Sequence, residues 1–208
     1  MKTIFVSPLK SDHYYHIFNQ GNNQEDIYKE GKNYIYFLEK YKELIAPIAK
    51  TYAFCLLPNH FHIFLKIKSY TGLSNALPVK FPRPPKILNG NSLNKEKLND
   101  FDNIISKKLS RRFAGFFAGY ARAINNGYGR SGKLFSLPFK RIEVKGDEHF
   151  KRLICYIHRN PIHHLFCENY NDWPYTPFYE IVEDKSDFIE TEAIIKLFGS
   201  TDAFKSAQ

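Results

Sequence analysis

The sequence predicts an α+β fold in which helices pack on one face of an antiparallel sheet. Some segments alternate apolar and polar side chains, as strands do, and others repeat apolar residues every three or four positions, as helices do. These segments follow the order strand, helix, hairpin, long helix, strand, helix. The chain has 208 residues, of which 43% are hydrophobic, so it can build one core with additions.

The first half of the chain contains a strand, a helix and a hairpin. Residues 14–19 are rich in aromatic and β-favouring side chains and end at a Gly-Asn-Asn turn, which indicates a strand. Apolar side chains in residues 31–45 recur at helical spacing and stop before a proline. Residues 48–57 and 60–67 are apolar runs on either side of a Pro-Asn dipeptide, which predicts a β-hairpin.

A polar, proline-containing stretch separates this hairpin from a longer helix. Residues 69–99 have no sustained period, so we expect an excursion or mobile loop there. Residues 101–125 carry apolar side chains at helical spacing and end at an Asn-Gly pair. Residues 133–144 have the composition of an extended segment interrupted by a proline.

The last predicted helix of the main unit spans residues 147–160, with Asp147 as its N-cap and Pro161 as its stop. A short amphipathic helix follows around residues 190–198. The order of the elements is that of the ferredoxin-like βαββαβ unit, followed by a C-terminal extension.

The positive charge of the chain is concentrated in its middle. The whole chain carries +9, but residues 44–142 carry +14 and the remainder −5. Residues 103–142 contain no acidic side chain and include many aromatic ones. Cations can follow the phosphates of a nucleic-acid strand while rings stack on its bases, so we expect a nucleic-acid partner. The candidate DNA-binding side chains are Lys107, Lys108, Arg111, Arg112, Arg122, Arg130, Lys133, Lys140, Arg141 and Arg152.

Composition also argues against several classes of protein. The three cysteines have unrelated spacings and form neither a disulfide framework nor a Cys-x-x-Cys zinc pair. No apolar run approaches the ~18 residues of a membrane span. The first residues lack the apolar core of a secretory signal. We therefore expect a cytoplasmic protein with no membrane partner.

Two histidines, His60 and His62, lie two residues apart in the second strand of the predicted hairpin. Alternate side chains of a strand point the same way, so both imidazoles can reach one divalent ion. A bare His-x-His is more often a pair of structural histidines than a metal site. These two, however, are polar side chains in an apolar strand, where burial without a partner is costly.

The predicted helix over residues 147–160 carries a second candidate group. Tyr156 and Asn160 are one turn apart and share a helix face, and Arg152 lies one turn earlier. A tyrosine hydroxyl can attack phosphorus, and an asparagine carbonyl can bind a metal ion. An aromatic residue on a helix is usually part of the core, so the spacing alone leaves a structural interpretation open.

Taken together, these segments resemble a known family. Residues 58–62, PNHFH, resemble the HUH motif (His-hydrophobic-His) of single-tyrosine DNA transposases. More specifically, the chain resembles the REP-associated tyrosine transposases in five segments that occur in the family's order: YYHIFNQGNN, YAFCLLPNHFHIFLKI, YGRSGKLFSLPFKRI, YIHRNPI and NDWPYTPF. The resemblance assigns residues 1–165 to a catalytic domain and residues 166–208 to an extension packed on it.

The resemblance implies an enzyme that nicks and joins single-stranded DNA beside a hairpin. His60, His62 and Asn160 would then hold Mg²⁺ or Mn²⁺. Tyr156 would be the nucleophile that forms a 5′-phosphotyrosine intermediate. Some members of the broader superfamily are dimers, and REP-associated relatives can act as monomers, so the sequence leaves monomer and homodimer open.

Some features depart from the family pattern or compete with this interpretation. Residues 136–138, Ser-Leu-Pro, stand where the family often has Gln-Gly-Arg, and residues 69–99 form a longer stretch than in compact relatives. Tyr120 and Tyr128 are rival nucleophiles by residue type, although Tyr120 is expected to pack or stack. Two other functions stay open: a non-catalytic hairpin-binding protein derived from a transposase, and a metal-independent phosphodiesterase with the two histidines as acid and base.

Overall fold

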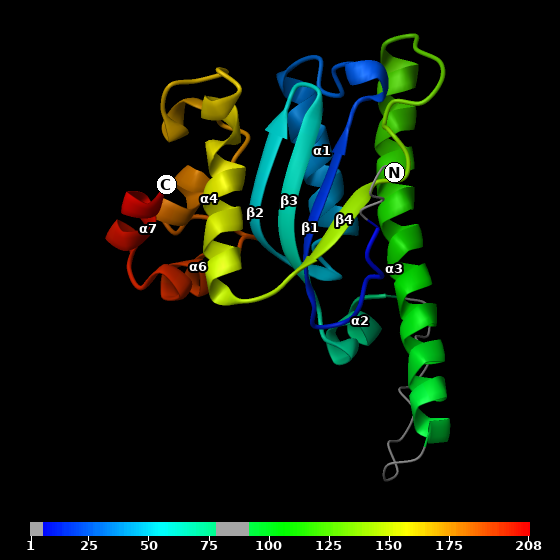
Figure 1. Ribbon diagram of the computed structural model, residues 1–208. Helices are drawn as coiled ribbons and strands as arrows, with labels where there is room; N and C mark the ends of the chain where they lie inside the picture. The colour runs from blue at the N-terminus through cyan, green and yellow to red at the C-terminus, as the bar shows by residue number, and fades with distance from the viewer. Residues whose placement is uncertain (1–5, 78–91) are drawn as a thin grey trace, which may run out of the picture.

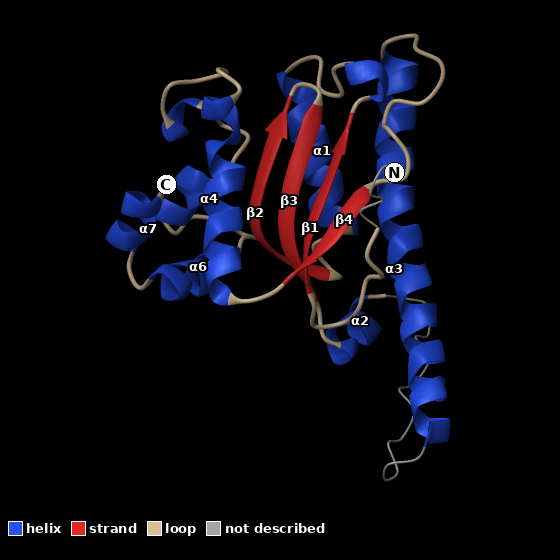
Figure 2. Cartoon of the chain, viewed as in Figure 1, coloured by secondary structure: helices blue, strands red, loops and turns tan. Residues whose placement is uncertain are grey.

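The predicted α+β fold is confirmed by a computed structural model, which describes residues 6–77 and 92–208, the latter with side chains from residue 97 onward. At its centre is a four-stranded sheet in the order β2-β3-β1-β4, in which every neighbouring pair is antiparallel (Figures 1 and 2). This is the strand order of the ferredoxin-like βαββαβ unit. The strands are β1 (Tyr14–Gln20), β2 (Ala49–Leu57), β3 (His60–Ile67) and β4 (Lys140–Val144).

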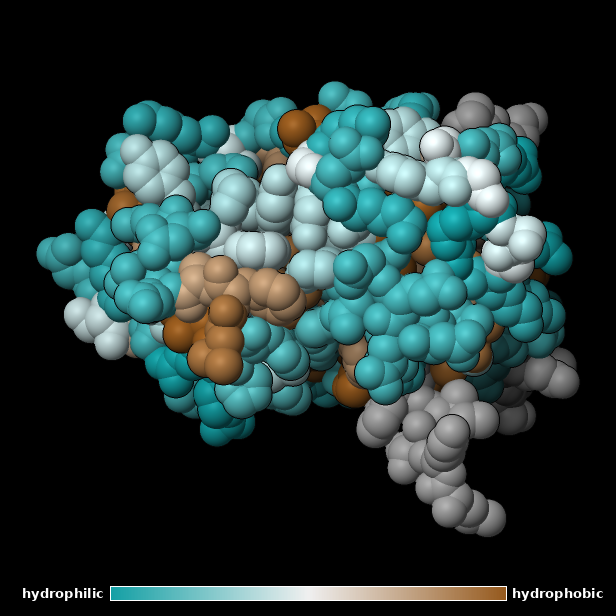
Figure 3. All heavy atoms as spheres, turned by 90° about the horizontal axis from the view of Figure 1, so that it is seen from above, coloured by the Kyte–Doolittle hydropathy of each residue, from teal (hydrophilic) through white to brown (hydrophobic). Residues whose placement is uncertain are grey.

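The described helices include two long ones in the connections between strands, a short one before the second of these, and four that follow β4. They are α1 (Gly31–Leu44), α2 (Tyr70–Ala76), α3 (Ser92–Gly127), α4 (Asp147–His163), α5 (Phe178–Val182), α6 (Thr191–Phe198) and α7 (Thr201–Ala207). Short 3₁₀ turns lie at Asn22–Gln24 and Tyr170–Asp172. The end of the molecule seen from above is mostly hydrophilic, with hydrophobic residues at a few places (Figure 3).

The two connecting helices, α1 and α3, pack on one face of the sheet, as predicted for the βαββαβ unit. Phe61 of β3 lies against Phe37 of α1 and Phe117 of α3, with ring centroids 5.4 and 5.3 Å away. All three side chains are buried. Burying large aromatic side chains of this kind contributes about 1.5–3 kcal/mol each, so this layer is the main core.

Helix α4 lies on the opposite face of the sheet, so the expectation that the helices share one face holds only for α1 and α3. The C-terminal helices lie on the side of α4 away from the sheet (Figure 1). Phe150 of α4 packs over Tyr14 and Phe64, with ring centroids 4.4 and 5.4 Å away. Behind α4, Phe204 of α7 lies edge-on to His158, with a centroid distance of 5.8 Å. Because the side chains of β3 alternate, this second face is the one that carries the strand's histidines.

The structure differs from the expected loop over residues 69–99 at both ends, where it has helices instead. Tyr70–Ala76 form α2, where the N-cap Ser69 accepts a hydrogen bond from the Gly72 N–H and Leu73 is buried. Helix α3 already begins at Ser92, before the predicted start at residue 101. Its first turns are polar, so no apolar period marks them in the sequence. Residues 78–91 lie outside the described residues.

Both predicted boundaries of α4 also differ from the structure. Gly146, with a φ of 83°, is the N-cap, so Asp147 acts instead as an acidic residue in the first turn. Pro161 does not stop the helix, which continues to His163. A proline removes one backbone donor, but the His164 N–H still donates to the Asn160 carbonyl at 2.9 Å and closes the last turn.

Buried His158 makes the fold sensitive to acid. Its Nδ1 lies 3.1 Å from Gln208 Oε1, and its Nε2 has no hydrogen-bond partner among the described residues. Burial lowers the pKa of His158 to about 4. The unfolded chain therefore takes up a proton below about pH 6.5 that the folded protein excludes.

Folding stability should consequently fall as the pH drops from about 6.5 to about 4, by up to about 1.4 kcal/mol per pH unit from this one group. We expect His158→Leu to weaken this pH dependence, because leucine fills the site without titrating. The measurement is the free energy of unfolding in urea at pH 7 and pH 5. A variant with the same difference as the wild type would contradict the prediction.

Candidate active site

His60 and His62 lie on the face of β3 that α4 covers. Their rings are side by side, with centroids 5.4 Å apart. The register of the sheet pairs His62 with Phe18 of β1, so His16, two residues before Phe18, also projects onto this face. His62 is 8% exposed, whereas His60 is partly buried.

In each of the two histidines, one ring nitrogen is engaged and the other makes no hydrogen bond to a described residue. Nδ1 of His62 lies 2.9 Å from Nε2 of His16. Nδ1 of His60 lies 2.7 Å from Oδ1 of Asn59, and it is the donor because a carbonyl oxygen only accepts. The Nε2 atom of His60 is therefore left for a ligand, and that of His62 is left for one in the tautomer whose Nδ1 donates to His16. Metal-binding histidines typically have their second nitrogen held in this way.

The electrostatics of this face keep the histidines neutral. Burial, followed by the neighbouring His16, lowers the pKa of His62 to about 2. Burial and the nearby His164 lower the pKa of His60 to about 4. At neutral pH both rings are therefore uncharged and hold a free electron pair, which a metal ligand needs.

Helix α4 places Tyr156 directly over this cluster. Its ring centroid is 5.5 Å from that of His62 and 6.3 Å from that of His16. The side chain is nevertheless 49% exposed, and no described residue hydrogen-bonds its hydroxyl. Tyr156 can thus meet a ligand that approaches from solvent while its ring stays beside the histidines.

Asn160 lies one turn after Tyr156 on α4 and one turn before His164, the C-cap of the helix. Residues 156, 160 and 164 are spaced by four, and the two ends of the row contact the histidine pair, since the His164 ring lies 5.0 Å from that of His60. Asn160 therefore lies on the same side of α4 as Tyr156. Its side chain is buried, and its Nδ2 donates to the Tyr156 carbonyl at 2.6 Å. The amide oxygen accepts no hydrogen bond from a described residue.

These residues have the chemistry of a metal centre, but of a mixed kind. Within the described part of the chain, no three His, Cys, Asp or Glu side chains are arranged to hold an ion together. A site here would combine the Nε2 atoms of His60 and His62 with the Asn160 oxygen and water. Two imidazoles and one amide oxygen suit Mn²⁺ better than Mg²⁺, which prefers oxygen ligands.

Sequence analysis missed two members of the cluster, His16 and His164. His16 stands in the YYHIFNQ strand, where alternation predicts its face but not which strand lies beside it. His164 follows Pro161 and is found only because α4 continues past the proline. The spacing of four from Tyr156 through Asn160 to residue 164 is the signal that could have identified it.

Five of the predicted DNA-binding side chains are exposed and make no ion pair or hydrogen bond to a described residue. Four of them lie on α3 or in the segment after it, and one lies on α4: Lys107, Arg111, Arg122, Lys133 and Arg152. Lys108 is partly buried on α3. Lys140 of β4 lies over the Phe18 ring, 5.6 Å from its centroid, and thus beside the histidine face.

The other three predicted cations are used within the fold. Arg112 donates from Nε to the Leu44 carbonyl at 2.9 Å, and Arg130 forms an ion pair with Glu25. Arg141 is buried and donates to the Ser7 carbonyl at 2.6 Å. Their intramolecular partners give these arginines a structural role whether or not they contact DNA.

The rival tyrosines are both engaged elsewhere. Tyr120 is buried and its hydroxyl donates to the Ile27 carbonyl at 2.9 Å, which confirms that it packs in the core. The Tyr128 hydroxyl donates to the Glu30 carboxylate at the start of α1. Neither ring contacts the histidine cluster.

Comparisons with known proteins give one structural similarity. No family model matches the sequence, and no curated protein is similar to it. Among solved structures, the chain is similar to a REP-associated tyrosine transposase bound to a REP hairpin, with a TM-score of 0.49 and 12% identity over 88% of this chain and 86% of that one. No helix in the described part of the chain is long and apolar enough to span a membrane.

Proposed function

We propose that this protein is a metal-dependent endonuclease and strand transferase that acts on single-stranded DNA beside a hairpin. The observation that carries the proposal is the position of Tyr156, an exposed tyrosine whose ring lies 5.5 Å from that of His62 in a pair of neutral histidines. A metal-binding pair and a nucleophile on facing elements are the parts that a phosphotyrosine reaction requires.

In the proposed reaction, the Tyr156 oxygen forms a bond to phosphorus as the bond from phosphorus to the 3′ oxygen breaks. The phenolic proton passes to solvent and the leaving 3′ oxygen takes up a proton. The products are a 5′-phosphotyrosine and a free 3′-hydroxyl. Because one phosphoester replaces another, a second 3′-hydroxyl can reverse the step and join strands without an added energy source.

The residues around Tyr156 have different roles in the proposed reaction. When bound, Mn²⁺ or Mg²⁺ supplies charge neutralisation at the scissile phosphate, held by His60, His62 and Asn160. His16 orients His62 from the neighbouring strand β1. Exposure of Tyr156 lets the strand enter from solvent, and nearby cations such as Arg152 can bind its phosphates.

The test is incubation of the protein with end-labelled hairpin oligonucleotides that carry single-stranded flanks, in Mn²⁺ or in EDTA. We expect a covalent protein–DNA adduct and a free 3′ end in Mn²⁺ only. Tight, salt-sensitive binding without scission in any metal would instead identify a non-catalytic hairpin-binding protein. Scission that persists in EDTA would identify the histidines as an acid–base pair.

The His16–His62 hydrogen bond predicts a measurable effect on metal affinity. We expect His16→Ala to weaken Mn²⁺ binding about 10- to 100-fold, because His62 loses the partner that fixes its ring. His16→Gln, which can place an acceptor near the lost Nε2, should recover part of the affinity. Titration calorimetry of the DNA-free protein with Mn²⁺ measures this directly. Equal affinities in wild type and His16→Ala, with fold intact by circular dichroism, would contradict a positioning role.

A further inference from the structure

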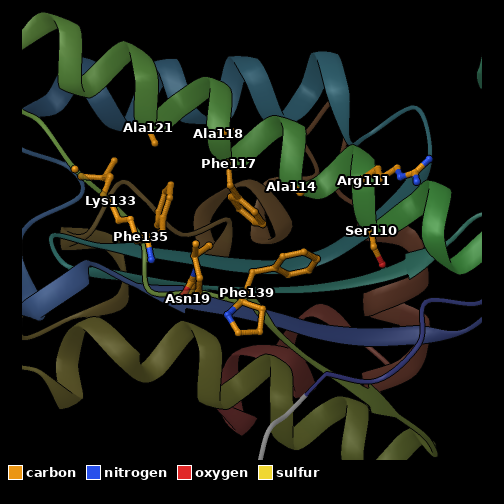
Figure 4. A pocket seen from close by; sticks show the side chains of 14 residues that line it. Asn19, Ser110, Arg111, Ala114, Phe117, Ala118, Ala121, Lys133, Phe135 and Phe139 are labelled. Atoms are coloured by element: carbon orange, nitrogen blue, oxygen red, sulfur yellow. The ribbon is translucent and has the colours of Figure 1, made fainter.

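A cavity lies on the other face of the sheet from the histidine cluster, between α3 and the segment that leads into β4. Its volume is about 470 Å³, in the range of small-molecule sites. Phe117 of α3 and Phe135 and Phe139 of the segment point into it (Figure 4). Its walls are almost wholly apolar, and the function proposed above makes no use of it.

The wall of this pocket opposite α3 is held in place by hydrogen bonds to the end of β1. The Ser136 N–H donates to the Gln20 carbonyl at 2.9 Å, and the Asn22 N–H donates to the Leu134 carbonyl at 2.8 Å. Asn19, which lines the pocket, donates from its side chain to the Ser136 carbonyl at 2.9 Å. These bonds make the pocket a preformed feature of the fold.

The α3 side of the pocket is kept open by small residues. Ala114, Ala118 and Ala121 line it at spacings of four and three, so they share one face of the helix. Ala114 and Ala118 are exposed. A large side chain at either position would occupy the space in front of the aromatic rings.

The charge around the pocket identifies its occupant. Arg111 and Lys133 line it from opposite walls, are exposed, and pair with no described residue. None of the described residues that line the pocket is acidic, and the sequence has no acidic residue from 103 to 142. An apolar, aromatic slot between unpaired cations matches one nucleotide of a strand, because its base has a π face and its sugar is linked to a phosphate on either side.

We propose that this pocket receives one unstacked base of the bound nucleic acid, with its flanking phosphates at Arg111 and Lys133. The proposal rests on the proposed function, since it names a second contact point of the same DNA. The two sites lie on opposite faces of the sheet, on either side of its edge strand β4. Phe139 faces the pocket, while Lys140, the next residue, lies over Phe18 on the histidine face. A strand that passes around β4 can therefore reach both sites.

The experiment combines a pocket-filling variant with abasic substitutions in the DNA. Ala118→Leu places bulk in the pocket, and Gly119→Leu is the matched control, because its side chain would enter open space beside the pocket. Both proteins and the wild type are titrated with a fluorescent hairpin oligonucleotide and with a set in which each unpaired nucleotide in turn is abasic.

We expect Ala118→Leu to bind the intact oligonucleotide about 5- to 150-fold more weakly, the range that stacking of one base on aromatic side chains supplies. Gly119→Leu should bind like the wild type. One abasic position should weaken wild-type binding by a similar factor and cause no further loss in Ala118→Leu, as expected for two changes that remove the same contact.

Three outcomes would overturn the pocket proposal. In the first, Ala118→Leu binds the oligonucleotide like the wild type. In the second, every abasic position lowers the affinity of that variant as much as it lowers the affinity of the wild type. In the third, the variant changes only the oligomeric state measured by light scattering, which would assign the pocket to another protein chain. If the wild type binds DNA and forms the adduct in any of these cases, only the pocket proposal fails. A wild type that binds no nucleic acid refutes both proposals together.

Discussion

Tyr156→Phe is expected to abolish adduct formation and strand cleavage, by at least about 10³-fold, while the protein keeps its fold and its affinity for DNA. The substitution removes one oxygen atom, and that atom is the proposed attacking group. The ring, which lies against His16 and His62, is retained. The hydroxyl makes no hydrogen bond to a described residue, so its loss should not destabilise the protein.

The matched control for this variant is Tyr179→Phe, which removes the same atom from another exposed tyrosine, on α5. We expect it to cleave like the wild type. Cleavage and adduct formation are followed on denaturing gels with DNA labelled at either end. If Tyr156→Phe forms the adduct at the wild-type rate, another residue is the nucleophile, and Tyr128→Phe is then the next variant to examine.

Loss of either proposed metal ligand, His60 or His62, should produce the second large effect. His60→Ala and His62→Ala are each expected to lower the rate of cleavage in Mn²⁺ by at least about 10²-fold, because charge on the scissile phosphate is no longer neutralised. Both rings are neutral at pH 7, since burial lowers the pKa of His60 to about 4 and that of His62 to about 2. The expected losses are therefore losses of a ligand rather than of a positive charge.

His13→Ala is the control for the histidine variants, because the His13 ring lies 2.9 Å from the Glu143 carboxylate and contacts neither His60 nor His62. It should retain full activity. Initial rates are measured over a range of Mn²⁺ concentrations and in EDTA. Unchanged cleavage by both His60→Ala and His62→Ala would contradict the metal site, and a loss that is the same in EDTA as in Mn²⁺ would point to acid–base catalysis instead.

Local patterns in the sequence were sufficient to predict the sheet, the two long connecting helices and the position of the histidine pair. The hairpin and its His-x-His follow from alternation and from a turn dipeptide, which are short-range signals. The hydrogen bond between His16 and His62 could not be predicted in this way. It depends on β1 lying beside β3 in this register, and that follows from tertiary packing of segments 46 residues apart.

The continuation of α4 past Pro161 and the pocket beside α3 also lay beyond the sequence. The favourable packing of α4 on the sheet outweighs the loss of one backbone donor near the helix end, so a local stop signal is overridden. The pocket is assembled from α3, from the segment before β4 and from Asn19 of β1. The aromatic residues of the basic region were expected to meet bases, whereas most of them, including Phe113 and Phe116, are buried in the core.

The measurement that tests the central claim most directly is identification of the amino acid joined to DNA. The protein is incubated with a hairpin oligonucleotide in Mn²⁺, the adduct is digested with nuclease and trypsin, and the peptide that retains a phosphonucleotide is sequenced by mass spectrometry. We predict that the modification lies on Tyr156, in the peptide that contains ICYIHR. A modification on another tyrosine would contradict the account. So would a protein that binds the hairpin tightly but forms no covalent adduct with it.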